Sequence, residues 1–166
     1  MKRVIALMLV ALVAPLAACG SDSNRSEVVL NFDLESVEKR LHKVGPGEQI
    51  LYGWNHLRSE TEFEGSTIEI ELQAGVEYVN GAGPCEGRFT LTFPDESVLA
   101  LAFIDCEAFT KSEASGARFS SRIRVIGGSG RFVDARGNGS YTGERRDEIG
   151  GVVRSRLALQ IDLGDE

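Results

Sequence analysis

The chain has 166 residues, and its 25 Asp and Glu residues outnumber its 18 Lys and Arg residues, which gives a formal net charge of −7. A chain this acidic lacks the basic surface that binding to nucleic acid or to an anionic membrane surface requires. Its length fits one domain with a sizeable hydrophobic core. We therefore expect a single folded domain with no nucleic-acid partner.

The first 18 residues have the pattern of a secretory signal peptide. Two basic residues precede an apolar run over residues 4–18, which is too short for a transmembrane helix. The run ends in LAAC, residues 16–19, which resembles the lipobox of bacterial lipoproteins, where the cysteine carries a lipid and becomes the new N-terminus. An ordinary signal peptide followed by an unrelated cysteine is the alternative interpretation.

We expect residues 1–18 to be removed, Cys19 to be lipidated and residues 19–26 to form a flexible polar tether ahead of a folded domain over residues 27–166. The mature chain then keeps 148 of the 166 residues, and the loss of two basic residues takes its charge from −7 to −9. The membrane is a partner only through the lipid. The predicted location is the cell envelope, outside the cytoplasmic membrane or in the periplasm or outer membrane.

Apolar residues alternate with polar ones along several segments, which is the period of a half-buried β-strand. We predict strands over residues 27–34, 48–58, 67–79 and 117–126. The clearest alternation lies in 67–79, where the even positions are apolar: Ile68, Ile70, Leu72, Ala74, Val76 and Tyr78. The segment 35–45 is either a short helix with Val37, Leu41 and Val44 inward or a long connection.

The strand predicted over 48–58 carries Tyr52, Trp54, His56 and Arg58 on one face. A row of aromatic and polar side chains can face a cavity and orient a ligand, so Tyr52, Trp54 and His56 are the candidate ligand-binding residues. In the alternative interpretation Tyr52 and Trp54 fill the core, while His56 and Arg58 reach solvent.

Two cysteines remain after lipidation of Cys19, and they predict a hairpin with a disulfide. The turn signal Pro94-Asp95-Glu96-Ser97 lies midway between Cys85 and Cys106. The residue numbers of each pair across the hairpin then add up to 191, so the two cysteines face each other. An exported chain meets a space in which disulfides persist.

The same register sets Phe89 opposite Ala102 and Leu91 opposite Ala100 on the buried face. It leaves Leu99, Leu101 and Phe103 on the other face. Three apolar side chains in a row require cover, which is either a loop or a subunit contact.

The C-terminal part predicts a second hairpin around Gly150-Gly151, because this dipeptide accepts the positive φ angles of a two-residue turn. In the strand after the turn, every second residue is apolar except one serine: Val153, Ser155, Leu157, Leu159, Ile161 and Leu163. In this register paired residues add up to 301, so Asp147 faces Arg154 and Arg145 faces Arg156 at a solvated tip.

The glycine-rich segment 125–143 either cradles a phosphate or bends strands. A phosphate loop needs a lysine after the glycines and then a helix, and here more strand follows. We therefore predict tight bends at a barrel end, with Phe132 and Ala135 as apolar plugs between them. With about eight strands and no long amphipathic helix, the residues predict an all-β antiparallel sandwich or barrel.

The motif GGSGRFVDARGNG, residues 127–139, resembles the signature of the allene oxide cyclase-like and dirigent-like barrel families. The resemblance is strong over 117–143 and weak before residue 66. It implies an antiparallel eight-stranded, calycin-like β-barrel with a central cavity, often assembled as a trimer. The signature marks the fold and not the chemistry, so no catalytic residue is carried over.

Three functions remain open. The first is a lipid-anchored exported barrel that holds a small apolar molecule. The second is a cyclase or isomerase of the two families, which needs a polar group deep among the apolar interior residues. The third is an envelope interaction protein with a filled barrel. No serine-hydrolase motif is present, neither His42 nor His56 lies in a context that marks a base, and no spacing suggests a metal site or a cofactor. The sequence therefore favours binding, or no small-molecule role, over catalysis.

Overall fold

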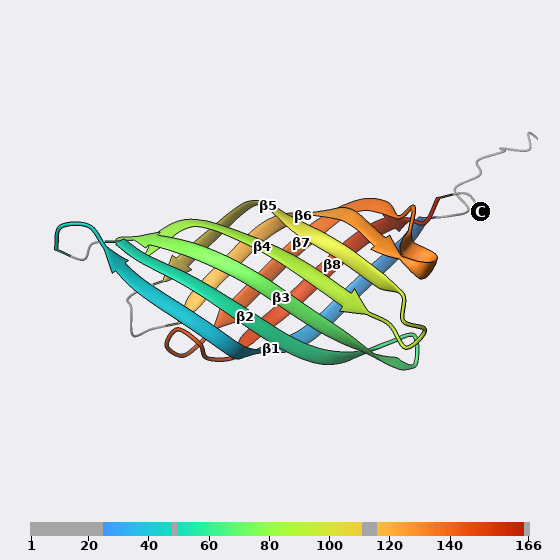
Figure 1. The fold of residues 1–166 in the computed structure, drawn as a ribbon, viewed down its shortest axis with the longest axis horizontal. Coiled ribbons are helices and arrows are strands. Elements are labelled where there is room, and N and C mark those ends of the chain that lie inside the picture. Colours follow the sequence, from blue (N-terminus) through green and yellow to red (C-terminus); the bar gives the residue numbers. More distant parts are fainter. Residues whose placement is uncertain (1–24, 48–49, 111–115, 165–166) are drawn as a thin grey trace, which may run out of the picture.

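Eight antiparallel strands form a closed barrel in the computed structural model of the protein, which describes residues 25–47, 50–110 and 116–164 (Figure 1). The strands follow the chain order around the barrel, and β8 pairs with β1 to close it. The elements are β1 Arg25–Val44, β2 Ile50–Phe63, β3 Ser66–Val79, β4 Ala82–Thr92, β5 Val98–Thr110, β6 Ala117–Ser129, the short 3₁₀ helix η1 Gly130–Phe132, β7 Arg136–Arg145 and β8 Val153–Asp162.

The prediction of an all-β, eight-stranded antiparallel barrel is confirmed, and the sandwich alternative is excluded by the closure between β1 and β8. The predicted signal peptide and the lipidation site Cys19 lie outside the described residues. Within the described part of the chain, no helix is long and apolar enough to cross a membrane.

Strand β1 runs through the segment 35–45, so both alternatives for that segment, a helix and a connection, are wrong. Its first half pairs with β8 up to Leu34, and its second half pairs with β2 as far as Val44. Backbone pairing with β2 is continuous from Glu38 to Val44, after a register shift at Val37. A short helix with three apolar positions would gain less free energy than this pairing provides. Val37, Leu41 and Val44, the expected inward side of that helix, are 56%, 41% and 50% exposed.

The β4–β5 hairpin has the predicted disulfide, but its register changes along its length. Cys85 pairs with Cys106, with their Cα atoms 4.8 Å apart. A bulge between Cys85 and Arg88 then shifts the pairing by one residue, and Asp105 on β5 takes a positive φ of 55°. An added residue of this kind turns the side chains beyond it to the opposite face.

The shift corrects the predicted face of β5. Phe89 pairs with Leu101 and Leu91 with Leu99, rather than with Ala102 and Ala100. Leu99 and Leu101 are 1% and 0% exposed, and both belong to the main core. The prediction that this row is exposed, under a loop or in a subunit contact, is therefore wrong.

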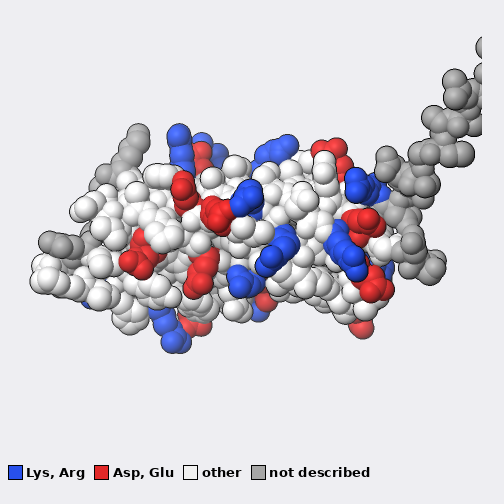
Figure 2. All heavy atoms as spheres, turned by 90° about the horizontal axis from the view of Figure 1, so that it is seen from above, with Lys and Arg blue, Asp and Glu red and all other residues white. Residues whose placement is uncertain are grey.

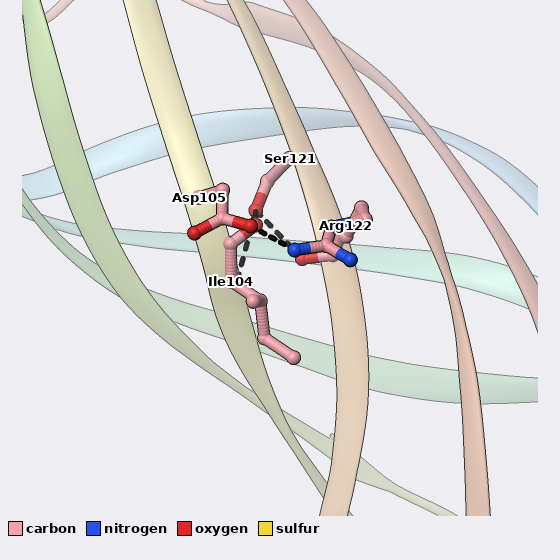
Figure 3. Close-up of polar contacts among 4 residues, drawn as sticks. All are labelled: Ile104, Asp105, Ser121 and Arg122. Carbon is pink, nitrogen blue, oxygen red and sulfur yellow. Dashed lines mark hydrogen bonds and ion pairs between the residues drawn. The ribbon is translucent and has the colours of Figure 1, made fainter.

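Ser121 on β6 provides side-chain hydrogen bonds beside the bulge of β5, where the β5–β6 register also shifts and backbone pairing is interrupted. Its hydroxyl accepts a hydrogen bond from the Ile104 N–H and donates to a neighbouring backbone carbonyl, either that of Ile104 or that of Arg122 (Figure 3). On the exposed side, Arg122 forms an ion pair with Asp105. A buried serine and an exposed ion pair thus hold the two strands together where the backbone pairing is interrupted.

The β7–β8 hairpin departs from its predicted register. Arg145 pairs with Val153 and Glu144 with Arg154, so the connection spans residues 146–152 and the two-residue turn at Gly150-Gly151 is wrong. Inside this loop Ile149 packs against a small cluster formed by Leu51, Tyr78 and Ala108. The apolar anchor explains why the loop is longer than the minimal turn.

The main core fills the barrel from the η1 end to the middle and contains buried residues from every strand. Phe132 and Ala135 are 5% and 6% exposed within it, which confirms the predicted plugs. At Gly128 any Cβ would overlap the Val98 carbonyl oxygen and the Phe132 side chain, so this glycine permits a close approach of backbone rather than a phosphate contact.

Tyr141 lies at the centre of the interior. Its ring packs against Phe89 and Phe103 at centroid distances of 5.3 Å and 5.2 Å. Its hydroxyl shares a hydrogen bond of 3.2 Å with Ser155, the single polar member of the inward row of β8. Burial raises the pKa of Tyr141 to about 12, partly offset by this hydrogen bond.

Removing the disulfide is expected to destabilise the barrel. Replacing Cys85 and Cys106 together with alanine frees a long hairpin in the unfolded chain, at a cost of about 3 kcal/mol. Urea denaturation measures the change, and the native protein under reducing conditions is the control, because it should unfold at the midpoint of the variant. Equal midpoints for the variant and the oxidised native protein would contradict the expectation.

The burial of Tyr141 predicts a loss of stability at high pH. An unfolded tyrosine releases its proton near pH 10, whereas the folded one keeps it to about pH 12. Stability is therefore full below pH 10 and falls by about 3 kcal/mol between these values. Urea denaturation of native protein and of Tyr141→Phe at pH 8, 10 and 11 measures this. The variant should lose less stability on raising the pH, and identical slopes would refute the assignment.

Candidate functional site

An interior cavity of about 60 Å³ lies at the end of the barrel opposite η1. At this end the β1–β2 tip extends beyond the other strands (Figure 1). Most of the wall is apolar, and its side chains with polar groups are Trp54, Asn55, Tyr78, Tyr141 and Arg145. The space lies between the main core and the cluster around Leu51. One water needs roughly 10–15 Å³ and drug-sized ligands about 300–1,000 Å³, so the cavity has room for a few waters or for one small group of a ligand.

Arg145 points into the barrel because it is the last residue of the inward row of β7. That row contains Gly137, Gly139, Tyr141, Gly143 and Arg145. The side chain of Arg145 is only 5% exposed. Its Nε donates a hydrogen bond of 3.2 Å to the Asp147 carbonyl, and its Cζ lies 5.8 Å from the centroid of the Phe119 ring. No ion pair of Arg145 is found among the described residues.

Tyr78, the last inward residue of β3, is the second polar group of the cavity. It is 3% exposed, and its hydroxyl has no hydrogen-bond partner of regular geometry in the described part of the chain. Burial raises the pKa of Tyr78, and the Arg145 guanidinium opposes this shift through its charge and through a hydrogen bond to the hydroxyl oxygen, without cancelling it. The hydroxyl is therefore neutral at ordinary pH and has a proton to donate.

The oxygens of Asn55 and Tyr141 in the wall, and Lys39 at the rim, have hydrogen-bond partners. The Ser36 hydroxyl donates to Asn55 Oδ1 at 2.6 Å. Lys39 on β1 donates from Nζ to the Ile149 carbonyl at 2.9 Å, which joins the β1–β2 tip to the β7–β8 loop. Exposed Leu41 also borders the cavity. Among the inward-facing polar side chains of the wall, Tyr78 and Arg145 are thus the pair with unused donors.

Tyr52, Trp54 and His56 share one face of β2, as predicted, but this face is opposite to the one with the buried Leu51 and Leu57. Tyr52 is 40% exposed, and of the three only Trp54 borders the cavity. They therefore lie on the outer side of the barrel. A ligand role for these three residues stays a prediction.

The surroundings of this outer row are mainly ionic. Arg40 lies 6.0 Å from the Trp54 ring centroid, and the Trp54 and His56 rings are 6.5 Å apart. Glu71 accepts from Arg58 at 2.6 Å and lies 3.8 Å from His56 Nε2, which has no hydrogen bond within the described residues. The arrangement holds the row on the surface of the sheet.

A larger hollow of about 960 Å³ lies on the outer surface, over β1, β2 and β5–β8. Its charged residues alternate in sign across paired strands in the order Asp33, Arg154, Glu144 and Arg118. Figure 2 likewise shows basic and acidic side chains interspersed over the face in view. Neighbouring charges offset each other there, so the small interior cavity is the better candidate site.

The sequence prediction missed Arg145 because it paired this residue with Arg156 at a solvated tip. The alternation from Gly137 to Arg145, with Tyr141 in the middle, is the signal that assigns Arg145 to the interior. Tyr78 was correctly predicted to face inward, but only as a core residue.

The described residues contain no group of three or more His, Cys, Asp or Glu side chains placed to hold a metal ion. Comparisons of the chain with protein-family models, with curated proteins and with solved structures find no match.

Proposed function

We propose that the protein is a lipid-anchored exported barrel that binds a small apolar molecule in the cavity opposite η1. The observation that carries the proposal is this cavity, which is bounded mainly by apolar side chains and includes donors without acceptors. Binding of an apolar ligand to such a wall is favourable, because the ligand displaces water that makes few hydrogen bonds there. The fold is compatible with the resemblance of residues 127–139 to allene oxide cyclase-like and dirigent-like barrels, and membership in that group is part of the proposal.

The position of β1 supports an anchor at the other end of the barrel. Arg25, the first described residue, pairs with Asp162 at the η1 end. Cys19 precedes it by six residues, a length that spans about 20 Å at most. A lipid on Cys19 then holds the η1 end near the membrane and leaves the cavity end directed away from it.

Catalysis of the cyclase or isomerase type is the second candidate, and one observation favours it. Tyr78 and Arg145 are polar groups placed deep among apolar residues, which this chemistry requires. The small volume favours binding, because the reacting chain of a large substrate has no room to be folded. The third function is an interaction protein without a ligand. The filled main core is compatible with it, and the binding test below distinguishes it from the first function.

Binding in the cavity is tested with 1-hexanol, followed by chemical-shift changes of backbone amides. We expect the changes to centre on cavity residues such as Ala74 and Val76. Ala74→Leu fills the cavity and should weaken binding about tenfold or more, whereas Ala158→Leu, the same change on the outer side of β8, should not. No saturable change in the native protein would reject the cavity and leave the filled barrel.

The anchor is tested by the intact mass of the protein purified from membranes of a bacterial host. We expect the chain to begin at Cys19 and to carry acyl chains, because the thiol is the site of alkylation. Cys19→Ser should keep residues 1–18 and lack the added mass, while Ser21→Ala should behave like the native protein. An unmodified native chain would rule out the anchor and leave the cavity proposal intact.

A further inference from the structure

Arg145 is a buried cation that lacks an anion. A guanidinium stays charged in proteins, so burial cannot be relieved by loss of its proton. Burying a charge is costly unless it is paired and hydrogen-bonded. The chain contains 25 Asp and Glu residues, yet none of those in the described part forms an ion pair with Arg145. Within the described residues its one regular side-chain hydrogen bond, to the Asp147 carbonyl, uses only Nε.

Tyr78 adds a second donor at the same place. Its hydroxyl is buried without a regular hydrogen-bond partner, and Arg145 lies near enough to act on its pKa. An unmade buried hydrogen bond is costly, and two such groups side by side require an acceptor that reaches both. The apolar walls, including Leu72, Val76 and Phe103, supply none from their side chains, and the oxygens of Asn55 and Tyr141 are already hydrogen-bonded to serines.

We propose that Arg145 and Tyr78 form a carboxylate-binding site and that the ligand of the cavity is a small carboxylic acid with a short apolar tail. This inference rests on the proposed function and names its ligand class. The planar guanidinium matches the two oxygens of a carboxylate, and the phenol donates a further hydrogen bond. The cavity of about 60 Å³ accepts the carboxylate and the first carbons of the tail, and the rest of the tail extends along exposed Leu41 at the rim.

The test compares hexanoate, 1-hexanol and hexylammonium, three ligands with the same tail and different heads. By chemical-shift titration, the native protein should bind hexanoate about tenfold tighter than 1-hexanol, since a charge-assisted hydrogen bond is about twice as strong as a neutral one. Hexylammonium should bind more weakly than 1-hexanol, because its charge opposes that of Arg145. Equal binding of hexanoate and 1-hexanol would overturn the inference and leave the proposed function standing.

Arg145→Met should abolish the preference for hexanoate and keep binding of 1-hexanol. Arg154→Met is the matched control, because this arginine is exposed on the outer side of the adjacent strand and should leave both affinities unchanged. A preference for hexanoate that survives in Arg145→Met contradicts the assignment. Loss of 1-hexanol binding in the native protein, in contrast, rejects the proposed function itself.

Tyr78→Phe keeps the inference testable even if loss of the Arg145 bond to the β7–β8 loop prevents folding. This variant removes a buried hydroxyl whose contact with Arg145 lacks regular hydrogen-bond geometry, and it leaves the Arg145 bond to the loop in place. The midpoint of its urea denaturation should therefore stay close to that of the native protein. It should nevertheless lose at least about half of the binding free energy difference between hexanoate and 1-hexanol. A variant that is less stable and keeps the full preference shows a structural role for Tyr78 and refutes its part in the site.

Discussion

Closure of the sheet through β1 is the constraint on which the rest of the structure depends. The strand pairs with β8 along its first half and with β2 along its second half, so one chain segment joins both edges. Once the sheet is closed, every alternate side chain points either to the interior or to solvent. The inward row of β7 thereby includes Arg145, although an arginine at the end of an open hairpin would have turned to water.

The fold class was predictable from sequence because the alternation of apolar residues is strong along β3 and β8. Ile68, Ile70 and Leu72 on one strand, and Leu157, Leu159 and Ile161 on another, are buried as their parity indicates. Pairing was less predictable, since one added residue at Asp105 or a longer loop around Ile149 changes the register without changing the local pattern. The error at the β7–β8 connection alone hid Arg145.

The candidate site could be predicted only in part for the same reason. An aromatic and polar row attracts attention in a sequence, yet Tyr52 and His56 lie on the outer side. The interior polar pair combines residues 67 positions apart, from the ends of β3 and β7, and its significance rests on missing partners. Missing partners are visible only after the neighbours of a side chain are known.

The covalent link between β4 and β5 has a consequence for how the hairpin can rearrange. The pair Cys85–Cys106 sets the strand register on one side of the bulge, and the Phe93–Ser97 turn sets it on the other side. The two registers differ by one residue. The surplus residue lies between this covalent link and the turn, so strand slippage can remove it only if the turn re-forms in another register. The register of the turn thereby keeps Leu99 and Leu101 inward.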